Sequence, residues 1–86
     1  MHKRGGEEKM KVKVWVDENG WGHVECEDEE QIVAEIVKRF GVHEGLAGQL
    51  LRAFCDRLRG ESTVYQDELL GNHPDVVEFL ESITEE

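Results

Sequence analysis

The histidines and cysteines are of metal-binding types, but their spacing does not suit a metal site. His23 and Cys26 lie three positions apart, and His43, Cys55 and His73 are further possible ligands. Residues of opposite parity leave opposite faces of a strand, which separates His23 from Cys26. The chain also lacks the Cys-x-x-Cys or His-x-x-x-His spacing that anchors zinc. We therefore expect no metal ion and no cofactor.

No sequence motif of catalysis is present. The chain lacks a glycine-rich phosphate loop, a nucleophile elbow and a serine–histidine arrangement. Its 20 Asp and Glu residues offer many carboxylate pairs, but their spacing singles out none of them as an acid–base couple. We expect a protein that is not an enzyme.

Charge is strongly segregated along the chain of 86 residues, whose formal net charge is −10. Residues 1–13 and 38–59 carry +3 each, whereas residues 14–37 and 60–86 carry −8 each. A surface with such a field attracts cationic partners and repels nucleic acid and anionic membranes. We expect the partner to be a basic protein surface, with no membrane contact and no direct contact with nucleic acid.

Rows of carboxylates are the candidate contacts to that partner. Carboxylates two apart on a strand are about 6.6 Å apart, and those three apart on a helix have Cβ atoms about 5–6 Å apart. These separations are close to the spacing of successive phosphates, so such rows can occupy a basic nucleic-acid channel. The predicted acidic contacts are Asp17, Glu18, Glu25, Glu27, Asp28, Glu29 and Glu30 in the first half, and Asp75, Glu78 and Glu81 near the C-terminus.

A β-hairpin must position the first acidic row. Apolar residues alternate with polar ones from residue 12 to 16 and again from 21 to 27. A three-residue loop over 18–20, with Gly20 at positive φ, pairs Val14 with Val24 on one face. A two-residue Asn-Gly turn is rejected because its register mixes polar and apolar side chains on one face.

Two tryptophans lie on the outer face of this hairpin. Trp15 and Trp21 share that face with His23 and are surrounded by acidic residues. A helix or the N-terminal tail covers them in one interpretation. In the other they are exposed anchors of an interface, where tryptophan is enriched.

Helical periodicity follows the hairpin. The predicted helices span residues 28–40, 44–59, 62–70 and 74–83. Asp28 is the predicted N-cap of the first, within a capping box, and Leu58 is expected to point inward from the second. Residues 63–65 have an edge strand as an alternative.

These elements predict the fold class α+β, with a two-stranded antiparallel hairpin packed on three or four short helices. Residues 1–9 hold no apolar anchor and are predicted to form a flexible N-terminal tail. Residues 10–86 are predicted to form a single domain.

The compartment predicted from the sequence is the cytoplasm. No apolar run approaches the roughly 20 residues of a membrane span, and the N-terminus lacks the apolar stretch of a signal peptide. Cys26 and Cys55 are too few for a disulfide scaffold. In a reducing compartment they are expected to be buried apolar side chains.

Residues 36–51 resemble a helix-turn-helix, the short helix, glycine turn and second helix of many repressors. The residues that carry the resemblance are Phe40, Gly41, Val42, Ala47 and Leu50. In that family, polar or basic side chains near the start of the second helix read the major groove. In this chain Gln49 and Arg52 offer such contacts. The resemblance implies a DNA-binding regulator, which stays an alternative.

In size, acidity and lack of a catalytic motif, the whole chain resembles the phage-encoded anti-CRISPR proteins and other DNA-mimic inhibitors. This resemblance implies a stoichiometric inhibitor that binds the DNA-recognition surface of a host defence complex. A third hypothesis is an assembly protein that uses Trp15 and Trp21 in a largely apolar interface.

Overall fold

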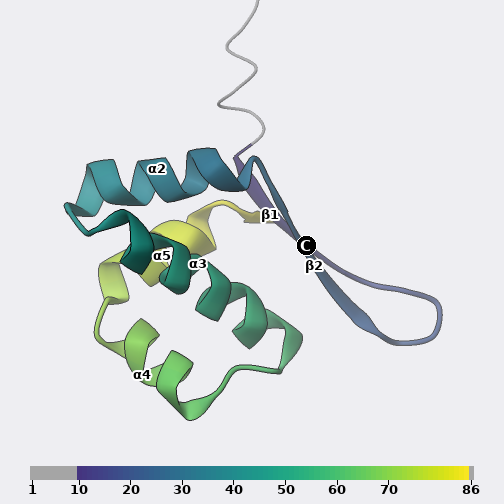
Figure 1. The fold of residues 1–86 in the computed structure, drawn as a ribbon. Helices are drawn as coiled ribbons and strands as arrows, with labels where there is room; N and C mark the ends of the chain where they lie inside the picture. Colours follow the sequence, from purple (N-terminus) through teal and green to yellow (C-terminus); the bar gives the residue numbers. More distant parts are fainter. Residues whose placement is uncertain (1–9, 86) are drawn as a thin grey trace, which may run out of the picture.

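The computed structural model describes residues 10–85; the predicted flexible tail over residues 1–9 lies outside the described residues, as does Glu86. The elements are β1 (Lys11–Val16), β2 (Gly22–Glu27), α2 (Glu29–Phe40), α3 (Glu44–Arg59), α4 (Val64–Gly71), α5 (Pro74–Ser82) and β3 (Thr84–Glu85). The helices lie together at one end of the hairpin, whose loop projects away from them (Figure 1). The predicted α+β class is confirmed.

The sheet has three strands in the order β2-β1-β3, where the sequence predicted a two-stranded hairpin. β3 pairs parallel to β1 and aligns Thr84 with Val12. The Val12 amide donates a hydrogen bond to the Ile83 carbonyl at 2.9 Å. An ion pair of 3.2 Å joins Lys11 to Glu85 beside this pairing. A two-residue strand is too short to show alternation in the sequence. It forms because the end of α5 brings the chain to the free edge of β1.

The hairpin has the predicted register. Val14 lies opposite Val24 across the antiparallel strands. The Asp17 amide donates to the Trp21 carbonyl at 3.0 Å, which closes a loop over residues 18–20, and Gly20 has the predicted positive φ, at 86°. Val12, Val14 and Val24 pack on the helical core from one face of the hairpin, whereas Val16 on the same face lies beyond the helices and is exposed.

Asp28 alone joins β2 to α2, and the predicted capping box does not form there. Its backbone is left-handed, with φ 60° and ψ 54°, and its side chain makes no capping hydrogen bond. A side-chain cap needs an extended N-cap residue, whereas the chain reverses here within one residue. Aspartate tolerates that conformation better than most residues do.

The corner between α2 and α3 has three residues and contains the predicted glycine turn. Gly41 ends α2 with a φ of 69°, and its amide donates to the Val37 carbonyl at 2.9 Å. His43 caps α3 by accepting a hydrogen bond from the Gly45 amide at Nδ1, at 2.9 Å. The bounds of α3 match the prediction.

Residues 64–71 are a helix, which decides between the two structures predicted for this segment. Thr63 Oγ1 accepts from the Gln66 amide at 3.1 Å, and the Thr63 amide donates to Gln66 Oε1 at 2.9 Å. This capping box satisfies two backbone donors that have no partner within the helix. The cap therefore fixes the start of α4.

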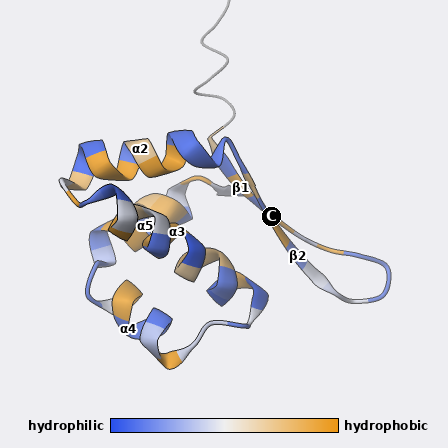
Figure 2. Cartoon of the chain, viewed as in Figure 1, coloured by the Kyte–Doolittle hydropathy of each residue, from blue (hydrophilic) through white to orange (hydrophobic). Residues whose placement is uncertain are grey.

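The core lies between the valine face of the hairpin and the inner faces of the helices. Hydrophobic stretches of the helices turn toward one another (Figure 2). Leu58 is 37% exposed, contrary to prediction, because it lies in the last turn of α3 at the edge of the core. The buried core residues are Val12, Ile32, Ile36, Ala47, Leu50, Leu51, Ala53, Phe54, Cys55, Leu70, Val76, Phe79 and Leu80.

Candidate partner-binding surfaces

Acidic side chains gather where β2 meets α2. Asp28, Glu29 and Glu30 are exposed there. Glu29 and Glu30 line one hollow together with Glu44, the first residue of α3. We call these four residues the acidic junction. Glu44 was not predicted from the sequence, because only the packing of α3 against α2 brings it beside Glu29 and Glu30.

The acidic row on β2 is interrupted by a cation. Glu25 is exposed, but Glu27 forms an ion pair with Lys13, with Nζ and Oε1 3.4 Å apart. Lys13 is also the cross-strand partner of Glu25. The strand therefore supplies a mixed charged surface beside the acidic junction, in which Lys13 stands opposite the predicted contact Glu25 and pairs with the predicted contact Glu27.

Asp17 is used within the hairpin loop. Its Oδ1 accepts from the amides of Asn19 at 2.9 Å and Trp21 at 3.0 Å, and its Oδ2 shares a hydrogen bond with His23 Nε2 at 2.8 Å. The bond to His23 and the Trp21 amide lower the pKa of Asp17 below its ordinary value. Asp17 thus shapes the loop, while Glu18 beside it is exposed.

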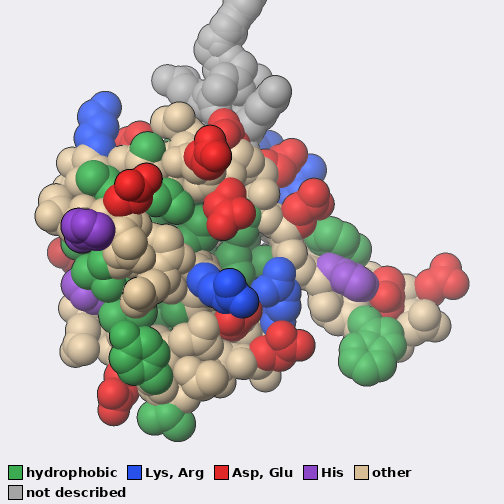
Figure 3. Space-filling view, in the orientation of Figure 1, with side chains coloured by type: hydrophobic (Ala, Val, Ile, Leu, Met, Phe, Trp, Pro, Cys, Tyr) green, Lys and Arg blue, Asp and Glu red, His purple; other side chains and the backbone are tan. Residues whose placement is uncertain are grey.

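The tryptophans at the end of the hairpin are exposed, so no helix of residues 10–85 covers them. Trp15 is 42% exposed and Trp21 is 70% exposed. The Trp15 ring stacks on His23, with centroids 5.3 Å apart and planes inclined by 18°. On the projecting hairpin, hydrophobic and histidine side chains lie next to acidic ones (Figure 3). We call Trp15, Val16, Glu18 and Trp21 the hairpin tip.

The three acids of α5 form the predicted stripe, and all are exposed: Asp75, Glu78 and Glu81. Arginines border the stripe at both ends. Asp75 and Glu78 share a hollow with Arg39. The Arg39 guanidinium lies 4.5 Å from the centre of the Phe79 ring. Glu81 shares a second hollow with Arg57.

The fold keeps the α5 stripe apart from the acidic junction. Arg39 of α2 lies over Phe79 of α5 and lines the hollow of Asp75 and Glu78, whereas Glu30 of the junction lies nine residues earlier on α2. At 1.5 Å per residue this separation is about 14 Å. The two predicted acidic sets therefore lie near opposite ends of α2 and do not form one surface.

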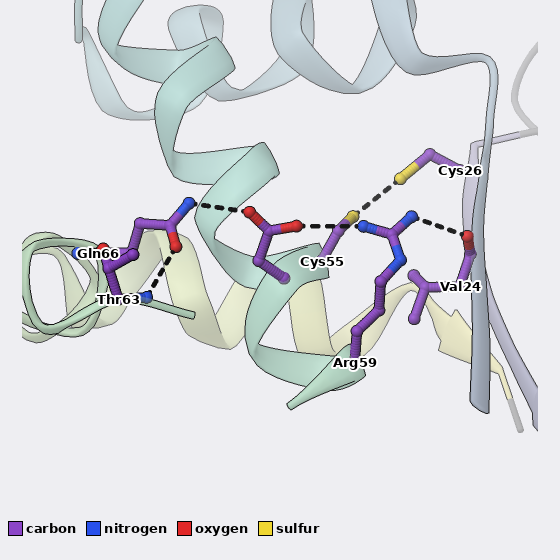
Figure 4. Close-up of polar contacts among 7 residues, drawn as sticks. Val24, Cys26, Cys55, Arg59, Thr63 and Gln66 are labelled. Carbon is purple, nitrogen blue, oxygen red and sulfur yellow. Dashed lines mark hydrogen bonds and ion pairs between the residues drawn. The ribbon is translucent and has the colours of Figure 1, made fainter. Parts of the chain in front are cut away.

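A polar network fixes the hairpin to the helices (Figure 4). Arg59 of α3 donates to the Val24 carbonyl of β2 and to Asp56 Oδ1, each at 3.1 Å. Asp56 Oδ2 accepts in turn from Gln66 Nε2 of α4 at 2.9 Å. In the same view the Sγ atoms of Cys26 and Cys55 point toward each other, 3.0 Å apart. The sequence predicted two buried cysteines: Cys55 is buried, whereas Cys26 is only half-buried, and their contact was not predicted.

The outer face of α3 holds the two residues that the helix-turn-helix resemblance singles out. Gln49 and Arg52 are exposed and line a hollow with Glu29 and Asp56. Tyr65 was not predicted from the sequence; it is 66% exposed and lines a second hollow with Gln49 and Arg52. Its segment carries no single apolar stripe, so the sequence pattern did not indicate which side of α4 faces solvent.

Within residues 10–85, no three His, Cys, Asp or Glu side chains are grouped to hold a metal ion. No helix of these residues has the length and apolar character needed to cross a membrane. Comparison of the chain with protein-family models, curated proteins and solved structures finds no match.

Proposed function

We propose that this chain is a non-enzymatic acidic binding protein of the cytoplasm that inhibits a nucleic-acid-binding complex by occupying its basic surface. The observation that supports this function is the exposure, side by side in the chain, of three carboxylates at the acidic junction. A partner that binds phosphates presents the lysines and arginines that such a surface attracts.

The charge balance of the described residues supports the proposal. Residues 10–85 hold seven Lys and Arg against seventeen Asp and Glu. Four of these seven cations form ion pairs with carboxylates of the same chain. Internal pairing therefore leaves a large excess of negative charge for a partner, and among residues 10–85 no cation lines the hollow of Glu29, Glu30 and Glu44.

The hairpin tip suits the same kind of partner. Indole rings bind lysine and arginine side chains through their faces, in addition to the apolar surface they offer. Trp21 is the more exposed of the two tryptophans and lies close in sequence to the exposed Glu18. The tip and the acidic junction can thus both contact a basic surface.

The proposal is tested by capture from a lysate of the native host with nuclease present, followed by mass spectrometry and competition. We expect a basic nucleic-acid-binding protein that is retained at about 0.1 M salt, released at about 0.5 M, and displaced by duplex DNA. A captured protein that neither high salt nor duplex DNA releases would contradict the proposal.

Matched variants locate the surface. Asp28→Asn, Glu29→Gln and Glu30→Gln together are expected to weaken binding of the captured partner at least tenfold. The control is Glu61→Gln, Asp67→Asn and Glu68→Gln, which changes the net charge equally at exposed positions in and before α4. Equal losses in both triple variants would indicate general attraction by net charge, without a localised surface.

The exposed tryptophans favour a second candidate, an assembly protein with an apolar interface. Its binding would resist salt and would fail in Trp21→Ala. The helix-turn-helix alternative predicts instead that the chain itself binds duplex DNA and loses that binding in Arg52→Ala. Gel-shift measurements on the purified chain separate it from both protein-binding candidates.

A further inference from the structure

We propose that Cys26 and Cys55 form a reversible disulfide that fastens the hairpin to α3. Cys26 lies on β2 and Cys55 on α3, 29 positions apart in the sequence. Their Sγ atoms are 3.0 Å apart, about 1 Å more than the roughly 2.05 Å of a formed disulfide. The chain has two cysteines in all, so each has one possible intramolecular partner.

The two thiols differ in access. Cys55 is 6% exposed, whereas Cys26 is half-buried. Both line the hollow on the outer face of α3, together with Arg52 and Arg59. A thiol that is partly exposed and near guanidinium groups is the kind that reacts, whereas a buried thiol in apolar surroundings is inert alone. Cys26 is therefore the residue that a reagent meets first.

The pKa shifts of the two thiols also indicate that Cys26 reacts before Cys55. The hydrogen bond between the two thiols lowers the pKa of Cys26, and Arg59 acts in the same direction, against the effects of burial, Glu29 and Glu25. That hydrogen bond and burial raise the pKa of Cys55. Cys26 is accordingly the attacking thiolate, and Cys55 is the thiol that resolves the intermediate.

The oxidant in this proposal is a low-molecular-weight disulfide, such as an oxidised tripeptide thiol. The Cys26 thiolate attacks one of its sulfurs, the reagent's S–S bond breaks, and one small thiolate leaves. Cys55 then loses its proton and attacks the Cys26 sulfur, which releases the second small thiolate. Two protein thiols are oxidised to one disulfide, and one small disulfide is reduced to two thiols.

The bond acts where the hairpin joins the helices. In the reduced protein, the hydrogen bond from Arg59 to the Val24 carbonyl links these two elements at the same place. A covalent link beside it fixes the hairpin, and hence the tip with Trp21, at one angle to α3. Cytosolic disulfides are in most cases transient and redox-sensing, which suits a contact of this kind.

The test exposes the purified full chain to oxidised glutathione and counts free thiols. We expect both thiols to be lost with the protein still monomeric, and an intact mass lower by that of two hydrogen atoms. The thermal midpoint is expected to rise by roughly 10–20 °C, because the bond closes a long loop of the unfolded chain. Dithiothreitol should reverse every change. Two titratable thiols after oxidation, or a disulfide-linked dimer, would overturn the proposal.

Single variants check the order of attack. Cys55→Ala is expected to stop at a stable mixed disulfide on Cys26, visible as added mass of one glutathione. Cys26→Ser is expected to react at least tenfold more slowly, because the remaining thiol is buried. Faster modification of Cys26→Ser than of Cys55→Ala would reverse the assignment of the two roles. The wild-type measurement decides the disulfide itself, even if a variant fails to fold.

Discussion

The helical body buries its large apolar side chains, whereas the hairpin tip exposes them. Leu50 of α3 is fully buried, while Val16 and Trp21 at the end of the hairpin are 67% and 70% exposed. Burial of apolar area stabilises a fold, and exposed tryptophan beside charge is typical of contact surfaces. The body therefore supplies the stability, and the tip presents groups that contribute little to folding.

Substitutions in the body are expected to have the largest effect on stability. Leu50→Ala removes a fully buried side chain and should lower the free energy of unfolding by about 2–5 kcal/mol. Leu58→Ala, in the same helix but partly exposed, is the control and should cost clearly less. Chemical denaturation followed by circular dichroism measures both, and equal losses would break the contrast between core and edge.

The cap of α4 is expected to matter less. Thr63→Ala removes the side chain that accepts from the Gln66 amide and should cost about 1 kcal/mol of stability. Thr63→Ser keeps the hydroxyl and should retain most of it. Urea denaturation distinguishes them, and a Ser variant as unstable as the Ala variant would show that the methyl group, and not the cap, carries the effect.

At the hairpin tip the expected effect is an acid-sensitive loop. The pKa of Asp17 is below its ordinary 3.8 in the folded protein, so its contribution to stability is complete above that pH. The contribution is lost as the pH falls through the lower, folded-state pKa. The NMR shift of the Trp21 amide should therefore titrate with a midpoint below 3.8, and this step should be absent in Asp17→Asn.

The smallest expected change in stability is at the exposed tryptophan. Trp21→Ala should alter the free energy of unfolding by no more than about 0.5 kcal/mol. It should nevertheless weaken binding of the captured partner at least tenfold, whereas Tyr65→Ala, equally exposed on the body, should not. A large loss of stability in Trp21→Ala would show that the tip belongs to the folding unit after all.

Local patterns were sufficient to predict most of the elements. The alternation of valines and the positive φ available to Gly20 fixed the hairpin register, since a shift by one residue would have mixed its faces. The ends of α3 followed from helical periodicity and Gly60, whose φ is 80°. Each of these depends on residues close together in the sequence.

Features that depend on distant segments were missed. β3 exists only because α5 returns the chain to β1, and the contact of Cys26 with Cys55 depends on how β2 packs on α3. The candidate site likewise has features that local sequence predicted and features that depend on packing. Its exposed carboxylates were predicted, but Glu44 and the separation of the junction from the α5 stripe arise from packing.

Part of the charge segregation has a cause within the fold. Glu29 and Glu30 begin α2, while Lys38 and Arg39 end it. Arg57 lies in the last turn of α3. Helix dipoles favour this placement of acids and bases, by about 0.3–1 kcal/mol per charge at the surface. The alternating blocks therefore reflect helix ends in addition to the partner surface that we propose.

The sheet order leaves β2 at an edge, with no partner strand on its outer side among residues 10–85. An open edge is a template on which a second copy can add a strand and begin aggregation. The net charge of −10 makes two copies repel each other at neutral pH. Near the sequence pI of about 4.8 this repulsion fades, so pairing of two copies along the edge of β2 is expected to increase.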